Sequence, residues 1–389
     1  MALVRSLVFV PFLALAVFLS SARAEDDDPA LRGRKLSAWI DLLHNGKNVE
    51  ARLAGLKAVQ IIGPRKSRKV VPAVLAAVRE NSEEKIRAAA ALAAGEMART
   101  AREEDDFPLD KTRDVLAAAL RTDKSGQVRE AAARALGVMK DKARGAVSVL
   151  AAAMKDSHPG TRTAAASSLR VLGPEAREAI GELQTALNNA KLERLTRVHC
   201  ALALGRIGSP DGLSAVPALR AVLAAGKNDA ELRKACAEAL GQLGKDAAKG
   251  APTLAAVLTS RDADVALRRA CAEALDQMGG DAHAALPALR MALKDDDVYV
   301  RSLSLHAVSR MGGELGDERK PAILGILACM DDNALEVRVA AIEALGNLGA
   351  DNLGDQSRAV TNRLTEASRD PQKAVAEAAQ VALKKLQGR

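Results

Sequence analysis

The apolar positions of this sequence repeat with a helical spacing inside a longer, regular period. The segment 337–349, VRVAAIEALGNLG, returns with small changes at 128–137 and 232–244. Aligning each copy on the position of Gly346, termed the anchor, gives ten copies at intervals of 33 to 42 residues. Such a period predicts an array of repeated units rather than separate compact domains. The anchors are Gln60, Gly95, Gly137, Arg170, Gly205, Gly241, Asp276, Ser309, Gly346 and Lys384.

Each copy predicts two helices. Residues 215–223, AVPALRAVL, typify the first, and the anchored segment forms the second, followed by a Gly suited to a left-handed C-terminal cap. No window alternates apolar and polar residues for long, so strands are not expected. A helix pair rich in Ala and Leu cannot bury its apolar face alone, and stacking on neighbouring pairs solves this.

Charged residues keep two fixed registers. Nine copies carry an Arg eight residues before the anchor, and six residues earlier most carry an Asp, with Asn81 in one copy. The Asp can cap the second helix, and the Arg can reach such a carboxylate in its own or an adjacent unit. Recurrence favours a structural ladder over unrelated surface pairs, which contribute little. The predicted ladder comprises Arg87, Arg129, Arg162, Arg268, Arg301, Arg338, Asp123, Asp156, Asp262, Asp295 and Asp332.

These features resemble the HEAT-repeat family, particularly its short subgroup of phycobilisome-lyase-type subunits. The likeness rests on the Asp–Arg pair, an apolar residue before the Arg, and a Pro in the first helix at Pro72, Pro217, Pro252, Pro287 and Pro321. It covers residues 31–389 and implies an all-α fold, a right-handed α-solenoid of about ten two-helix HEAT-like repeats. The shared residues are structural, so the likeness implies no activity.

The N-terminus has the pattern of a secretory leader. Arg5 precedes an apolar run over 7–19, and Ala22-Arg23-Ala24 offers a cleavage site. A membrane anchor is the alternative, but thirteen apolar residues fall short of the roughly 20 that span a bilayer. We therefore expect a signal peptide over 1–24, an acidic segment over 25–30, and a periplasmic or secreted protein with no membrane span after cleavage.

Two departures from the repeat stand out. Trp39 is expected to seal the first unit, since terminal repeats need modified faces. The 42-residue interval contains REEDDFP at 102–108, which predicts an acidic loop insertion at about 98–110. This loop is either a recognition element or an ordinary solvated loop.

The charge balance argues against a nucleic-acid partner. The chain carries +8, and removing Arg5 and Arg23 leaves 55 basic against 49 acidic residues, or +6. This excess is spread along the chain. Outside the leader the aromatic residues are Trp39, Phe107 and Tyr299, too few for the stacking platforms of single-strand binders.

The sequence offers no catalytic, cofactor or metal motif, so we expect neither an enzyme nor a cofactor. Cys200, Cys236 and Cys271 share one small-residue register, which predicts buried free thiols, because stacked helices stand too far apart for disulfides. The five His lie apart, without metal-ligand spacing. A lyase-like or other enzyme subunit on this fold is the alternative function.

The expected function is instead protein binding on the concave face. Second helices usually line that face in solenoids, and the positions three before and one after the anchor should form its exposed ridge. The predicted function is therefore an exported, non-catalytic scaffold or adaptor with protein partners. The candidate partner-binding ridge is Arg134, Arg206, Glu238, Glu273, His306, Arg310, Glu343 and Asn347.

Overall fold

The computed structural model describes residues 28–102, 106–226 and 229–388, and within them twenty α-helices form ten successive pairs. The first helices are α1 (Leu36–Asn45), α3 (Val70–Glu80), α5 (Leu109–Thr122), α7 (Val147–Ala153), α9 (Ile180–Asn188), α11 (Val216–Ala224), α13 (Ala251–Leu258), α15 (Leu286–Ala292), α17 (Arg319–Cys329) and α19 (Ser357–Ala367). The second helices are α2 (Val49–Ile62), α4 (Glu84–Thr100), α6 (Gly126–Val138), α8 (Pro159–Leu172), α10 (Arg194–Ile207), α12 (Ala230–Gln242), α14 (Val265–Met278), α16 (Val298–Met311), α18 (Leu335–Leu348) and α20 (Lys373–Leu386). The predicted all-α solenoid of about ten two-helix units is confirmed.

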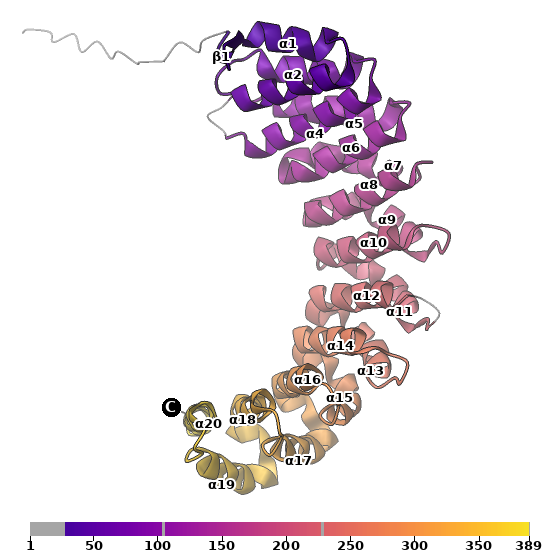
Figure 1. The fold of residues 1–389 in the computed structure, drawn as a ribbon. Helices are drawn as coiled ribbons and strands as arrows, with labels where there is room; N and C mark the ends of the chain where they lie inside the picture. Colours follow the sequence, from indigo (N-terminus) through magenta and orange to yellow (C-terminus); the bar gives the residue numbers. More distant parts are fainter. Residues whose placement is uncertain (1–27, 103–105, 227–228, 389) are drawn as a thin grey trace, which may run out of the picture.

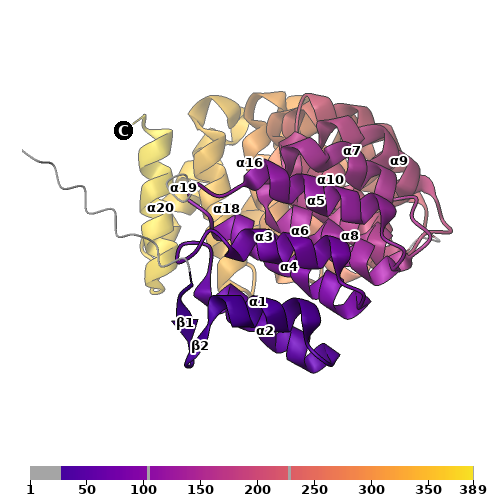
Figure 2. The ribbon, with the colours of Figure 1, turned by 90° about the horizontal axis from the view of Figure 1, so that it is seen from above.

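The units stack into a curved array. Each second helix packs on its own first helix and on the second helices of the neighbouring units, as α6 does on α4 and α8. The stack bends into an arc whose inner face is lined by second helices and whose outer face is lined by first helices (Figure 1). Seen from above, the units follow a curved path from α1 to α20 (Figure 2). One apolar core, built mainly of Ala, Leu and Val, runs through the array.

Short 3-10 segments connect units in most of the array. They are η2 (Lys140–Ala146), η3 (Gly173–Ala179), η4 (Asp211–Ala215), η5 (Gly244–Gly250), η6 (Gly279–Ala285), η7 (Gly312–Glu318), η8 (Ala350–Asn352) and η9 (Gly354–Gln356). Several contribute small buried residues, such as Ala143 and Ala176, beneath the helices. The connections are therefore part of the core.

The anchor glycines lie inside the second helices, where neighbouring backbones approach closely. A Cβ on Gly205 would stand 2.6 Å from the Cα of Ala239, and one on Gly346 would stand 2.8 Å from the Cα of Ala382. Such distances leave no room for a side chain. A small anchor residue therefore permits the tight stacking of the inner helices.

The helix-ending cap stands three residues after the anchor. Gly208, Gly244 and Gly349 there have φ values of 78°, 66° and 76°, a left-handed conformation that Gly adopts without steric cost. At the same register after α6, Lys140 takes a φ of 55°. The predicted left-handed glycine cap is therefore present in these units. It is a different residue from the anchor, which lies inside the helix.

A β-hairpin covers the N-terminal unit, although no strands were expected. β1 (Ala30–Leu31) and β2 (Arg34–Lys35) pair antiparallel. The indole nitrogen of Trp39 donates to the carbonyl of Leu31 at 3.2 Å, and the Arg34 guanidinium lies 4.5 Å from the centroid of the Trp39 ring. The sequence pattern missed the hairpin because two residues are too few to show alternation. Trp39 thus joins the first helix to this cover.

The insertion differs from the predicted loop over 98–110 at both ends. Helix α4 continues to Thr100, and α5 begins at Leu109. The Nζ of Lys142, from the next unit, donates to the carbonyls of Ala98 and Ala101 at 2.9 and 2.7 Å, which favours the helix end by placing a cation there. Residues 103–105 of the acidic stretch lie outside the described residues.

The predicted leader, residues 1–24, also lies outside the described residues, as do 25–27 of the acidic segment. In the described part of the acidic segment, the carboxylate of Asp28 accepts a hydrogen bond from the Ser37 backbone N–H at 2.6 Å, near the start of α1. Among the helices of the described residues, none is both long and apolar enough to cross a membrane.

Candidate functional site

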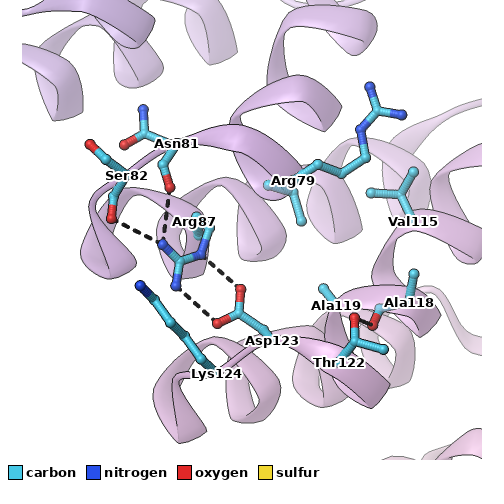
Figure 3. Close-up of a pocket in the computed structure, with 11 residues that line it drawn as sticks. Arg79, Asn81, Ser82, Arg87, Val115, Ala118, Ala119, Thr122, Asp123 and Lys124 are labelled. Atoms are coloured by element: carbon cyan, nitrogen blue, oxygen red, sulfur yellow. Dashed lines mark hydrogen bonds and ion pairs between the residues drawn. The ribbon is translucent and has the colours of Figure 1, made fainter.

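One arginine–aspartate pair shows how consecutive units are tied together. Arg87 of α4 donates from Nε and Nη2 to the carboxylate of Asp123 in the next unit, at 2.7 and 2.9 Å (Figure 3). Its Nη1 donates to the carbonyls of Asn81 and Ser82 in its own unit, at 3.0 and 3.2 Å. The two paired side chains are only 6% and 10% exposed. The pair is therefore a buried clamp, and both of its side chains line a hollow of about 500 Å³.

The same geometry recurs along the array. Arg129 binds Asp156 through two hydrogen bonds of 2.7 Å, and Arg268 binds Asp295 at 2.8 and 3.0 Å. Further pairs are Arg301 with Asp332, at 2.8 Å, and Arg162 with Glu193 in place of an aspartate. In each pair the carboxylate belongs to the following unit. The sequence left open whether the partner was in the same or an adjacent unit, and the geometry places it in the adjacent one.

The aspartates that bind an arginine of the preceding unit also accept a hydrogen bond in their own turn. The carboxylate of Asp123 accepts from the Ser125 backbone N–H at 2.8 Å, and that of Asp156 accepts from the His158 N–H at 2.7 Å. Burial would raise the pKa of Asp123, but the hydrogen bonds from Arg87 and Ser125 outweigh it, so the pKa lies below its usual value. The same balance lowers the pKa of Asp156 and Asp332. These carboxylates are therefore held in their charged form.

Asp262, assigned to the ladder from sequence, does not join it. In the turn before α14 the Asp262 side chain is exposed, Ala263 is buried, and within 229–388 no arginine reaches this carboxylate. Asp264 takes the capping role and accepts from the Leu267 N–H at 2.8 Å. The preceding arginine, Arg233, donates to the carbonyl of Leu223 at 2.9 Å instead. The turn is folded differently here, and spacing alone could not show that.

Arg338 keeps only half of the ladder geometry. Its Nη1 donates to the carbonyl of Asp332 at 2.6 Å, but its Nη2 meets the side-chain oxygen of Gln372 at 2.6 Å rather than a carboxylate. Arg197, at the same register in α10, donates to the carbonyl of Leu187 at 2.8 Å. The ladder is therefore interrupted in the middle of the array and ends on an amide.

The predicted ridge residues all belong to second helices, which line the inner face of the arc (Figure 1). Glu238 and His306 are half-exposed and the others are exposed. Some already have partners on the same face, such as Arg134 with Glu130 and Asn347 with Lys385. The set is Arg134 on α6, Arg206 on α10, Glu238 on α12, Glu273 on α14, His306 and Arg310 on α16, and Glu343 and Asn347 on α18.

The comparison with known families agrees with this architecture. The family model described as HEAT repeats matches residues 113–194, 183–266, 216–309 and 251–346, which together span more than half of the chain. The chain belongs to the HEAT-repeat family. The match is to HEAT repeats in general, and the narrower resemblance to phycobilisome-lyase subunits stays a prediction.

Two solved structures are similar to this fold at low sequence identity. An engineered protein is 20% identical with a TM-score of 0.58, and the match covers 90% of this chain and 98% of that chain. A chain from a structure of Kap95p binding to RanGDP is 14% identical with a TM-score of 0.67. That match covers 90% of this chain and 50% of that one. No curated protein matches the sequence. At these identities the structures support the fold alone.

Exposed apolar side chains also occupy the ridge registers of this HEAT-repeat array, and the sequence analysis missed them. Leu92 and Val381 stand three residues before their anchors, and Ile61 and Val171 stand one after. All four are exposed. Inspecting both registers in all ten copies would have revealed them. The inner face of the HEAT repeats is therefore mixed, with charged and apolar stretches.

A charged anchor creates one polar cluster on the inner face. Asp276 occupies the anchor position, where the other nine units of this chain have no carboxylate. Its Oδ2 lies 3.9 Å from Nη1 of Arg310. Burial raises the pKa of Asp276, while Arg310 and His306 oppose the shift. Two predicted ridge residues thus gather around a half-buried carboxylate.

The four thiols are part of the packing. Cys200, Cys236, Cys271 and Cys329 are buried and free. Burial raises the pKa of Cys200 and Cys271 to about 12 and that of Cys329 to about 11. Because the thiolate is the nucleophile and metal ligand, these groups are poorly reactive at neutral pH. In the described part of the HEAT array, no three His, Cys, Asp or Glu side chains gather as metal ligands would.

Proposed function

We propose that this HEAT-repeat protein is an exported, non-catalytic scaffold that binds protein partners along its inner face. The proposal rests on one observation: charged residues at different registers have different roles in the structure. Most of the arginines eight residues before the anchor form hydrogen bonds or ion pairs within and between units, as Arg87 and Arg129 do. The residues three before and one after the anchor are exposed or half-exposed on the second helices, which line the inner face of the arc.

This division separates stability from recognition. The arginines eight residues before the anchor bind groups within the stack, so they are not available to a partner. The residues three before and one after the anchor present side chains such as Glu273 and Arg310 from consecutive helices, about 8–10 Å apart, the usual spacing of packed helices. A partner that follows the groove can meet several units at once. Solenoids use extended concave surfaces in this way.

Affinity capture tests the proposal on the inner face. Mature protein used as bait on the native envelope fraction should retain a specific protein, and Arg310→Glu should reduce its recovery at least several-fold. Lys320→Glu on α17 of the outer face is the matched control, since the two side chains are 56% and 61% exposed. A partner retained by Arg310→Glu but lost with Lys320→Glu would place binding on the wrong face.

Export rests on the leader pattern of residues 1–24. Cleavage after Ala24 leaves a chain that begins with Glu25. Mass spectrometry of the protein isolated from its native host should therefore find Glu25 as the first residue. An intact chain that begins at Met1 or Ala2 would contradict export through a cleaved leader.

A further inference from the structure

One hollow on the second helices lies across α4, α6, α8 and α10. Its volume is about 550 Å³, within the range of small-ligand and side-chain pockets. Val138, Val171 and Leu195 are the large apolar side chains among its lining residues. Val171 is 40% exposed and Leu195 is 53% exposed, so both offer apolar surface to a partner. Burying such surface is favourable in proportion to its area.

Arginine and lysine side chains outnumber carboxylates among the lining residues of this hollow. Arg99, Arg134 and Lys140 line it, and the acidic lining residue is Glu96. Glu96 accepts from Arg99 at 2.8 Å, and Glu130, on the same helix as Arg134, accepts from Arg134 at 2.5 Å. Lys140 is exposed and has no carboxylate within ion-pair distance among the described residues. Three cations therefore meet two carboxylates, and the surface of the hollow keeps a positive excess.

The inner face beyond the hollow has the opposite character. The second helices α12, α14 and α18 present Glu238, Glu273 and Glu343 at the register that holds Arg134 in α6. The groove is thus basic and apolar around α6 to α10 and more acidic toward the C-terminal end. Because of this difference, the hollow favours acidic ligands more than the C-terminal part of the same surface does.

We propose that this hollow is a docking subsite for an acidic segment of a protein partner, one that carries a large apolar side chain close to an Asp or Glu. The inference rests on the proposed binding function and specifies its partner chemistry. The apolar side chain covers Val171 and Leu195, while the carboxylate meets Arg134 or Lys140. Arginine forks bind carboxylates with charge-assisted hydrogen bonds, which adds direction to the apolar contact.

A displayed library of random 12-residue peptides, selected on the mature protein, tests this proposal. Enriched peptides should pair Asp or Glu with Leu, Ile, Phe or Trp. The best one, made synthetically with a fluorescein label, should bind at least tenfold more weakly to Arg134→Glu and to Leu195→Asp. Matched controls are Arg79→Glu on the outer helix α3 and Leu335→Asp in the first turn of α18, where an exposed Leu stands as Leu195 does in α10. Both controls should keep the wild-type affinity.

Each other outcome is informative. Peptides insensitive to the hollow variants but lost with Arg310→Glu would overturn the subsite and leave inner-face binding intact. Enrichment of basic peptides, or no enrichment over an unrelated bait, would also overturn it. Displacement of the peptide by an equal concentration of single-stranded oligonucleotide would show a phosphate site instead. Peptides insensitive to every inner-face variant would contradict both the subsite and the proposed function.

Discussion

Arg87→Ala is expected to lower the free energy of unfolding by about 3 kcal/mol, the scale found when one member of a buried ion pair is removed. The substitution leaves Asp123 only 10% exposed and without its two guanidinium donors. It also leaves the carbonyls of Asn81 and Ser82 without their partner at the start of α4. The loss should concentrate at the boundary between the second and third units, because stability in a solenoid is a sum over units and their interfaces.

Arg134→Ala is the control for this experiment, since Arg134 lies in the second helix of the next unit and is 62% exposed. Its ion pair is a surface pair, and we expect a change within about 0.5 kcal/mol. Denaturant melts of the two variants, read together with hydrogen exchange of α4 and α6, make the comparison. Equal stabilities would show that the ladder does not hold the units together.

Gly205→Ala is expected to destabilise the protein by about 2 kcal/mol, in the range for overpacking a close contact. The added methyl would stand 2.6 Å from the Cα of Ala239 and 2.9 Å from its Cβ, so α10 and α12 would have to separate. Those atoms belong to backbone or to a short side chain and cannot swing aside. The expected loss exceeds the roughly 1 kcal/mol by which Ala is favoured over Gly inside a helix.

The same substitution at Gly181 should have the opposite sign. A Cβ there meets nothing within 4 Å, and the residue lies on the exposed side of α9. Gly181→Ala should therefore stabilise the protein by about 0.5 kcal/mol through helix propensity. Thermal or denaturant unfolding of the pair measures both effects. A stabilised Gly205→Ala would mean that the inner helices are not in close contact at the anchor.

The repeat and its two helices could be predicted from sequence because they depend on local patterns. Apolar spacing recurs in each unit, cap glycines such as Gly349 and small anchor residues recur in most units, and the ten copies reinforce one another. A strand as short as β1 leaves no such pattern. The extension of α4 to Thr100 depends partly on Lys142 from the following unit, and therefore on tertiary contact.

The ladder shows where sequence spacing stops being sufficient. The six-residue spacing from Asp123 to Arg129 allows a pair within one unit or between adjacent units, and in the structure Asp123 binds Arg87 and Arg129 binds Asp156. Spacing specifies the registers, whereas the rise from unit to unit decides which carboxylate each guanidinium meets. At Asp262 the same spacing is kept, but a differently folded turn exposes the side chain. Only the three-dimensional arrangement distinguishes these cases.

The central claim is that partners bind the inner face formed by the second helices, and site-specific photo-cross-linking tests it most directly. A benzoylphenylalanine would replace Glu238, Glu273 or Glu343 on the inner face, and Met291, Lys320 or Leu324 on the outer face, with the native envelope fraction as the source of partners. We expect cross-links to one protein from the inner positions and none above background from the outer positions. Cross-links to that protein from the outer positions alone would contradict the account.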